Sequence, residues 1–162
     1  MPLYYLALAN DASKKGMPET LELLQTYSHR HPGQFWPLHF LGHASFQTAR
    51  TSQSPSDLRY AESLTKKSVG LQGSYADSHL DLGNVYFQQE LWKEAMKEYE
   101  KAISLQPDLI QAYFKLYGAY LQVGDSAQAQ REKNIRQRLQ QQETERGARQ
   151  RQVSIFLYKL QN

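Results

Sequence analysis

The sequence predicts an all-α fold, a right-handed α-α superhelical solenoid of about four helical hairpins with a C-terminal capping helix. Three observations predict it: apolar residues recur with helical spacing, equivalent positions recur 34 residues apart, and capping or breaking residues separate the apolar segments. The chain has 162 residues, 40% of them hydrophobic and 22% charged. This is enough for one domain or a short repeat array, but not for two full-sized domains.

The period of 34 residues is clearest between the segment 76–109 and the segment that follows it. Leu82 and Tyr86 in the first correspond to Leu116 and Tyr120 in the second. Leu82 and Tyr86 are four residues apart, as are Leu116 and Tyr120, so the two residues in each segment share one face of a helix. Small residues recur beside them and predict close approach of helix backbones. The positions that define the repeat are Leu82, Gly83, Tyr86, Ala95, Tyr99, Ala102, Pro107, Leu116, Tyr120 and Ala129.

An earlier copy of the Leu-Gly pair shows that the second unit is longer than the others. Leu41-Gly42 stands 41 residues before Leu82-Gly83, seven more than the period. The polar segment 48–57 contains Pro55 and breaks the apolar pattern, so we expect it to be a loop insertion. Within it, Ser54-x-x-Asp57 resembles a capping box. The units are therefore expected near 1–34, 35–75, 76–109 and 110–143.

This pattern resembles the tetratricopeptide repeat (TPR) family, whose 34-residue helix–turn–helix unit has the signature W-x2-L-G-x2-Y, A-x3-F and P. The resemblance covers roughly residues 1–143 and is most specific in the third unit. Lys133 and Arg136 occupy the phases of Tyr99 and Ala102, so we expect the array to end with the fourth unit. The resemblance implies a non-catalytic protein-interaction scaffold that binds an extended peptide or partner segment in its concave groove.

In this family the groove is lined by one stripe on the first helix of each unit. Gln47, Gln88 and Gln122 share one phase, which predicts a row of carboxamides suited to an extended peptide backbone; the alternative is that they are solvated helix formers. The stripe as a whole maps to Trp36, His39, His43, Gln47, Leu80, Asn84, Gln88, Gln111, Phe114 and Gln122.

A co-chaperone-like adaptor would normally hold a C-terminal carboxylate with lysines in this stripe. That clamp is missing, because Tyr5, His39, Leu80 and Phe114 stand at the lysine positions, and only Asn84 matches an asparagine. The resemblance therefore predicts a protein partner without identifying it.

The C-terminal segment is expected to be helical. Residues 126–151 are rich in Gln and Arg, which favours a long solvated helix. Residues 144–162 are expected to form an amphipathic helix that caps the repeat array, with docking to a partner or to the rest of a longer chain as the alternative. Its apolar stripe consists of Val153, Phe156, Leu157 and Leu160.

Several function classes are excluded or disfavoured. The chain has no Cys, which removes disulfides, thiolate metal sites and thiol nucleophiles, and it carries none of the common catalytic or phosphate-binding motifs. His39 and His43 lie four apart, as in a two-ligand metal site, but no third ligand is visible. We therefore expect no enzyme activity, cofactor or metal. The longest apolar stretch near the N-terminus has seven residues, too few for a membrane span, so a cytoplasmic location is the default expectation.

Two alternatives stay open. Residues 131–162 carry eight Lys and Arg against three Asp and Glu, which could serve nucleic-acid binding through the basic C-terminal helix. Acidic residues interrupt this basic stretch and no aromatic residue stands between Tyr120 and Phe156, so we favour a solvated helix face. The chain could also be a module of a larger multidomain protein or enzyme.

Overall fold

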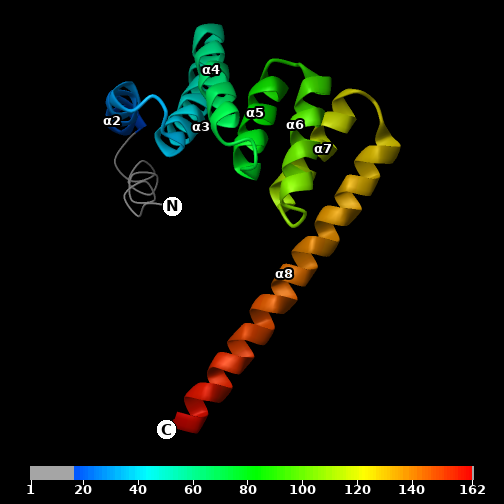
Figure 1. Cartoon of the computed structure of the whole chain (residues 1–162). Helices are drawn as coiled ribbons and strands as arrows, with labels where there is room; N and C mark the ends of the chain where they lie inside the picture. Colours follow the sequence, from blue (N-terminus) through cyan, green and yellow to red (C-terminus); the bar gives the residue numbers. More distant parts are fainter. Residues whose placement is uncertain (1–16, 162) are drawn as a thin grey trace. The chain divides into compact units, whose positions relative to one another are not determined.

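The computed structural model describes residues 17–161, and within that part all regular secondary structure is α-helical (Figure 1). The predicted all-α fold class is therefore confirmed, whereas the helix expected at the start of the first repeat, with Tyr5, lies outside the described residues. The helices are α2 (Met17–Arg30), α3 (Phe35–Ser52), α4 (Pro55–Leu71), α5 (Ala76–Gln88), α6 (Trp92–Leu105), α7 (Ile110–Gln122) and α8 (Ser126–Gln161).

The chain divides into two compact units, residues 1–107 and residues 108–162. The first contains α2 to α6, and the second contains α7 packed against α8. This division differs from the expected boundary between residues 143 and 144. The reason is that the fourth helical hairpin and the C-terminal segment share one helix, α8, and therefore belong to the same unit.

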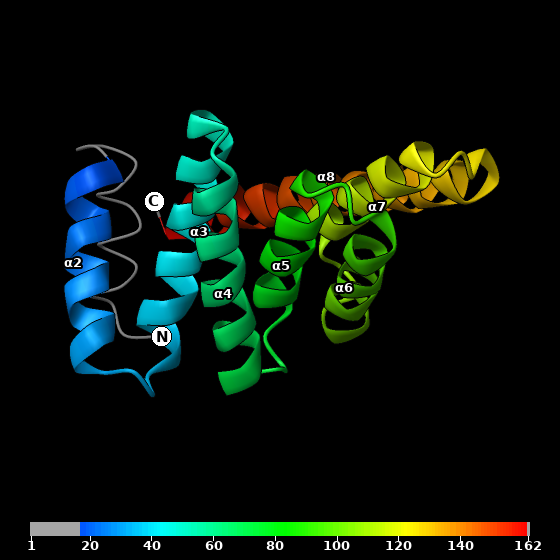
Figure 2. The ribbon, with the colours of Figure 1, turned by 90° about the horizontal axis from the view of Figure 1, so that it is seen from above.

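Within the first unit, consecutive helices form antiparallel hairpins that lie side by side (Figure 2). Small residues permit this packing, as predicted. A Cβ atom at Gly42 in α3 would lie 3.1 Å from Cγ2 of Thr65 in α4, and Ala61 and Ala95 are completely buried. The helices α3, α5 and α7 begin at Phe35, Ala76 and Ile110, where the sequence predicts the starts of the second, third and fourth repeats.

Apolar clusters connect successive helices of the first unit. One cluster joins α2, α3 and α4, and the second joins α3, α4 and α5. Because α3 and α4 contribute to both clusters, the α3–α4 hairpin buries its apolar residues against a helix on each side and not alone. The buried members are Leu24, Leu38, Leu41 and Leu64 in the first cluster, and Phe46, Ala61 and Val85 in the second.

The loop expected at residues 48–57 is not present. Helix α3 continues to Ser52 and α4 begins at Pro55, so the connection is a two-residue turn. Gln53 closes α3 in the left-handed conformation, with φ of 52°, and the Ser54 hydroxyl accepts a hydrogen bond from the Asp57 amide. The predicted Ser54 cap is therefore present, but it starts a helix inside the segment interpreted as a loop.

The seven additional residues lengthen the helices instead. The α3–α4 hairpin spans 37 residues from Phe35 to Leu71, whereas the α5–α6 hairpin spans 30 residues from Ala76 to Leu105. Seven residues correspond to about two helical turns, so the extra length can be absorbed without rotating the apolar faces out of register. The polar residues of the insertion then lie on solvated helix surface.

The separate capping helix expected at residues 144–162 is also not formed. The residues from 144 to 161 continue α8, a single helix of 36 residues. All residues from Gln140 to Ile155 are exposed except for the partly buried Gly147. The Gln- and Arg-rich sequence favours an uninterrupted helix, and Val153 is 56% exposed instead of covering a core. Across residues 17–161, no helix is both long and apolar enough to cross a lipid bilayer.

Candidate partner-binding face on helices α3 and α5

The ten predicted groove residues are distributed over the two units. Seven lie on α3 and α5 of the first unit, and three lie on α7 of the second unit. We call the seven the α3–α5 face: Trp36, His39, His43, Gln47, Leu80, Asn84 and Gln88. The three on α7 are Gln111, Phe114 and Gln122.

The members of the α3–α5 face differ in accessibility. His43 and Gln88 are exposed, whereas Trp36, Gln47 and Asn84 are partly buried. His39 and Leu80 are only 7% and 5% exposed, because they pack between the helices. These two side chains lie beneath the exposed residues of the face and offer almost no surface to a bound peptide. Phe46, which directly precedes Gln47 on α3, is buried and belongs to the core.

A hydrogen bond between α3 and α5 fixes the orientation of His43. Its Nδ1 lies 2.9 Å from Oδ1 of Asp81, a residue that is 5% exposed. The hydrogen bond to the Asp81 carboxylate, and the charge of that carboxylate, raise the pKa of His43 above its ordinary value of 6.5. The exposed His43 therefore keeps its imidazolium form to a higher pH than a free histidine does.

Asp81 is a functional candidate that the sequence analysis missed. It directly precedes the Leu82-Gly83 pair, just as Phe40 precedes Leu41-Gly42. Asp81 thus occupies the repeat position at which α3 has the partly buried Phe40. A carboxylate at a buried position needs a partner, so this difference could have identified Asp81 from the sequence. The identity of that partner, His43, required the packing of α3 against α5.

His39 belongs to a buried polar chain. Its Nδ1 lies 3.1 Å from the Ser78 hydroxyl, which lies 3.0 Å from the Ser68 hydroxyl. Burial lowers the pKa of His39, although the Asp81 carboxylate opposes this effect. The Nδ1 atoms of His39 and His43 both face protein partners, and residues 17–161 contain no cluster of three or more His, Asp or Glu side chains suited to a metal ion.

Aromatic rings form one end of the α3–α5 face. The ring centroids of Trp36 and Tyr75 are 5.3 Å apart, with planes inclined by 79°, and Trp36 also stacks on Phe40. Burial, assisted by the nearby Asp77 carboxylate, raises the pKa of Tyr75 to about 12. Trp36 therefore combines a packing role with partial exposure at the surface.

Two of the three carboxamides of the face, those of Asn84 and Gln47, have partners within the first unit. The Tyr99 hydroxyl donates to Oδ1 of Asn84 at 3.2 Å. Gln47 receives a hydrogen bond from Arg50 at Oε1, and its Nε2 lies 3.5 Å from Nε2 of His43. Gln88 is exposed. Since Gln122 lies in the other unit, a row formed by all three glutamines stays a prediction.

The three predicted residues on α7 are all exposed. Phe114 is 48% exposed, and the guanidinium carbon of Arg136 in α8 lies 5.3 Å from its ring centroid. This cation–π contact belongs entirely to the second unit. Arg136 therefore packs on an aromatic ring, and its charge is only partly available to another partner.

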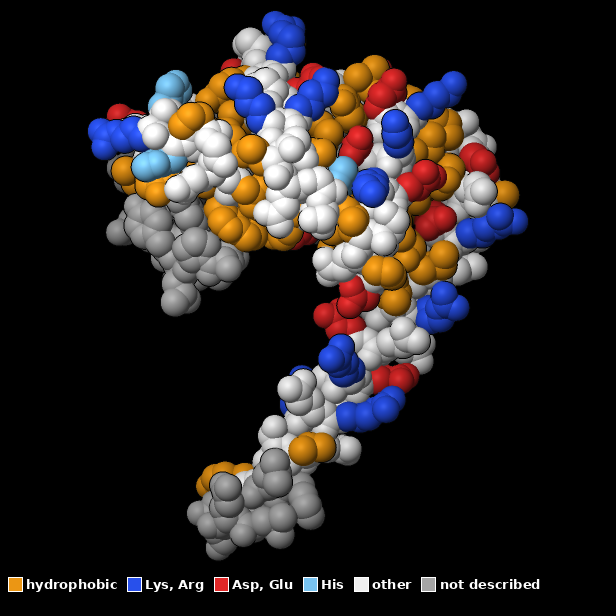
Figure 3. Space-filling model, in the orientation of Figure 1, with side chains coloured by type: hydrophobic (Ala, Val, Ile, Leu, Met, Phe, Trp, Pro, Cys, Tyr) orange, Lys and Arg blue, Asp and Glu red, His pale blue; other side chains and the backbone are white. Residues whose placement is uncertain are grey.

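The basic residues of α8 do not form a continuous stripe. Lys and Arg side chains alternate with acidic and uncharged ones along this helix (Figure 3). Arg149 pairs with Glu145 at 3.6 Å, and Arg131 donates a hydrogen bond to Gln128. These contacts do not add support for nucleic-acid binding through α8.

A family model described as TPR repeat matches residues 83–124, from Gly83 in α5 to Gly124 after α7. This segment is a tetratricopeptide repeat. The resemblance inferred from the sequence is thus confirmed where its signature is clearest, and the matched repeat contains Asn84, Gln88, Gln111, Phe114 and Gln122 of the predicted groove.

Solved structures extend the likeness in fold beyond this TPR repeat. A crystal structure of MamA has a TM-score of 0.75 and 22% identity, covering 87% of this chain and 79% of MamA. A structure titled MamA MSR-1 has a TM-score of 0.70 and 18% identity, covering 86% and 76%. The O-GlcNAc transferase of Thermobaculum terrenum, as a K341M mutant, has a TM-score of 0.63 and 22% identity over 72% of this chain, but only 21% of the transferase.

At these identities the solved structures support the fold alone, and no curated protein matches the sequence. The TPR solenoid fold supports a protein-interaction scaffold in general terms.

Proposed function

We propose that this protein is a non-catalytic interaction scaffold that binds an extended, partly apolar peptide segment of a protein partner. The observation that carries the proposal is the composition of the α3–α5 face. An exposed, carboxylate-oriented histidine, His43, stands among partly exposed aromatic and carboxamide side chains.

These side chains suit the chemistry of an extended peptide. Asn84 and Gln88 offer amide donors and acceptors that match backbone N–H and C=O groups. Trp36 offers partly exposed aromatic surface for an apolar side chain. His43, with its raised pKa, supplies a donor that strengthens when the pH falls.

The absence of catalysis is part of this proposal. Within the described residues, His43 and Asp81 form a dyad, and the Nε2 atom of His43 lies 3.5 Å from the Gln47 carboxamide. An amide is a poor nucleophile, so this dyad suits binding and not group transfer. A larger protein that contains this chain as a module could still be an enzyme, since the similar transferase structure corresponds over 21% of its own length.

Selection from a random linear peptide library tests the proposal directly. The full chain is the bait, and the affinity of each selected peptide is measured by fluorescence anisotropy. The variant His43→Ala/Gln88→Ala changes two exposed residues of the α3–α5 face. The control Lys97→Ala/Lys101→Ala changes two exposed residues of α6.

We expect the face variant to weaken peptide binding by roughly fivefold to thirtyfold, which corresponds to one or two net hydrogen bonds, and the control to leave it unchanged. Equal affinity for the face variant, with its helical circular dichroism retained, would refute binding on this face. Peptides that respond only to changes in α7 or α8 would move the site to the second unit.

A further inference from the structure

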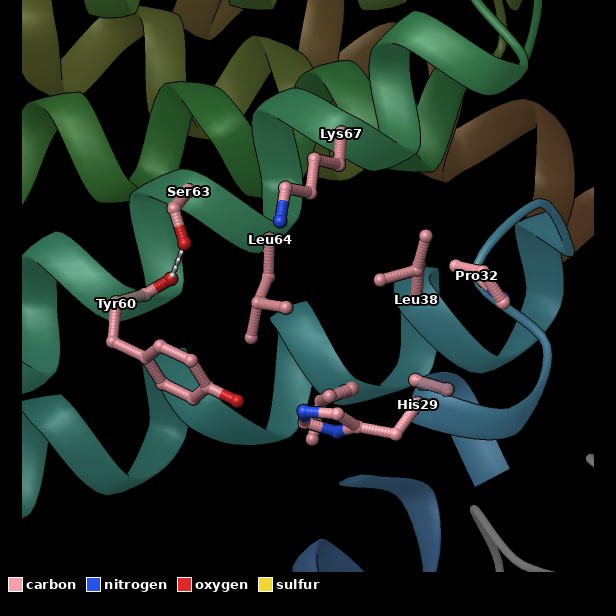
Figure 4. Close-up of a pocket in the computed structure, with 9 residues that line it drawn as sticks. His29, Pro32, Leu38, Tyr60, Ser63, Leu64 and Lys67 are labelled. Atoms are coloured by element: carbon pink, nitrogen blue, oxygen red, sulfur yellow. Dashed lines mark hydrogen bonds between the residues drawn. The ribbon is translucent and has the colours of Figure 1, made fainter. Parts of the chain in front are cut away.

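A second candidate site lies on the opposite side of α3 from α5, among helices α2, α3 and α4. The cavity has a volume of about 330 Å3, at the lower end of the range typical of small-molecule sites, roughly 300–1,000 Å3 (Figure 4). All of its lining residues belong to the first unit: Ser28, His29, Pro32, Leu38, Leu41, Tyr60, Ser63, Leu64 and Lys67.

The floor of the cavity is apolar. Leu38 and Leu41 from α3 and Leu64 from α4 are each at most 6% exposed, yet they line the space. An aliphatic or aromatic group placed there would replace water against these side chains, and burial of its surface would provide the main binding energy. The floor alone does not define which ligand fits.

A buried hydroxyl beside the cavity has no partner within the described part of the chain. Ser28 is 7% exposed, and its Oγ makes no hydrogen bond. A buried hydroxyl without a partner destabilises the folded state, so few such groups persist in folded proteins. Because Ser28 also lines the cavity, rotation about its χ1 bond would bring this hydroxyl to a ligand oxygen that accepts the unused hydrogen bond.

The rim of the cavity is cationic and rich in donors. Lys67 is exposed and makes none of the ion pairs of the described residues, and the exposed Tyr60 supplies a phenolic hydroxyl. His29 donates from Nδ1 to the backbone oxygen of Gln25, which leaves Nε2 as the atom available to a ligand. The nine lining residues include no acidic side chain. In Figure 4, Tyr60 and Lys67 from α4 and His29 from α2 surround the same space.

We propose that this cavity binds a small free carboxylic acid with an apolar body, such as an aryl-alkyl or branched alkyl carboxylate. The apolar body rests on the three leucines. The carboxylate lies at the rim, where the Lys67 ammonium group donates to one oxygen and the Ser28 hydroxyl can donate to the other. This assignment uses two donors that have no partner among the described residues, and it places the single negative charge where the lining is positive.

A free acid fits these surroundings better than the terminus of a peptide. Eight of the nine lining residues lie in helices, where their backbone N–H groups are already hydrogen-bonded, and the ninth is Pro32, which has no N–H. The carbonyl groups of a bound peptide would therefore find no main-chain donor around the cavity. A small acid has no such groups to satisfy.

Isothermal titration calorimetry on the full chain tests this proposal with three probes. They are 3-phenylpropionate, the matching neutral 3-phenylpropionamide, and N-acetyl-glycyl-phenylalanine as a peptide terminus. We expect the free acid to bind roughly tenfold more tightly than its amide, because a charge-assisted hydrogen bond is lost in the amide. Amide chemical shifts should change at Ser28, Leu41 and Leu64.

Two variants identify the donors, and one serves as control. Lys67→Met should weaken binding of the acid roughly tenfold, whereas Lys97→Met on α6 should not change it. Ser28→Ala should weaken binding by about threefold to tenfold while raising the melting temperature of the free protein, because it removes an unsatisfied hydroxyl. A purely structural Ser28 would not produce this opposite pair of effects.

Several results would overturn the proposal. One is failure of the wild-type chain to bind 3-phenylpropionate, and another is binding that is unaffected by both Lys67→Met and Ser28→Ala. Tighter binding of the peptide terminus than of the free acid would overturn the assignment to a free acid. Because the donors lie on α2 and α4, these results are independent of peptide binding on the α3–α5 face.

Discussion

A Cβ atom added to Gly83 would lie 2.5 Å from Cε1 of Tyr99, a side chain with no exposed surface. The ring of Tyr99 thus occupies the space that any other residue at position 83 would need. The Tyr99 hydroxyl then reaches Asn84, next to this glycine, so the contact connects the α5–α6 packing to the candidate partner-binding face.

Replacement of Gly83 by alanine is therefore expected to destabilise the first unit. Overpacking should cost about 1–3 kcal/mol even after the gain in helix propensity, because the buried ring has no free space to enter. Gly70→Ala on α4 is the matched control, since a Cβ atom there meets nothing within 4 Å. Urea unfolding measures both. A Gly83→Ala protein as stable as the wild type would contradict the packing.

The sequence predicted this packing because a repeat signature records which residues must be small and which must be large. Gly83 and Tyr99 are both signature positions, and the helix starts at Phe35, Ala76 and Ile110 follow the same period. The residue types at such positions are determined by contacts between neighbouring helices, and these contacts recur in every repeat.

The segment 48–57 was misinterpreted because composition alone does not separate a loop from a solvated helix. Thr48, Arg50 and Thr51 make hydrogen bonds within α3, to Ala44, Gln47 and Thr48 respectively. Seven residues make about two helical turns. The hairpin can therefore be lengthened by seven residues while its apolar side chains stay on the buried faces.

The candidate site could be predicted only in part. The position of a residue within the repeat predicted that His43 and Gln88 are accessible. It could not show that His39 and Leu80 are buried or that Asp81 orients His43. These features depend on contacts between α3 and α5 that occur once in the chain. A repeat pattern carries no information about them.

The contact between His43 and Asp81 predicts a specific pH dependence. Since the pKa of His43 in the folded protein lies above 6.5, its stabilising contribution is complete below about pH 6.5 and is lost as the pH rises through the folded value. The pKa of His39 is lowered, so its contribution has the opposite sign and opposes folding as the pH falls below 6.5.

Titration of the imidazole Cε1 protons by NMR separates these two effects. We expect His43 to titrate above 6.5 in the wild-type protein and closer to 6.5 in Asp81→Asn, which keeps an acceptor but removes the charge. The remote substitution Asp108→Asn should leave the titration of His43 unchanged. If His43 titrated below 6.5 in the wild type, the hydrogen bond to Asp81 would not control its protonation.

The exposed part of α8 predicts where the described residues are most sensitive to proteolysis. The side chains from Gln140 to Ile155 make almost no buried contacts, so this part of the helix depends on local propensity and opens more readily than packed helices. Limited trypsin digestion should therefore cleave after Arg146, Arg149 or Arg151 before it cleaves after Arg50 at the end of α3.

Gly147→Ala should slow this cleavage severalfold, because alanine gains about 1 kcal/mol in a helix interior and a Cβ atom there meets nothing within 4 Å. Early cleavage after Arg50, identified by mass spectrometry, would instead mean that the α3–α4 turn is less stable than the C-terminal part of α8.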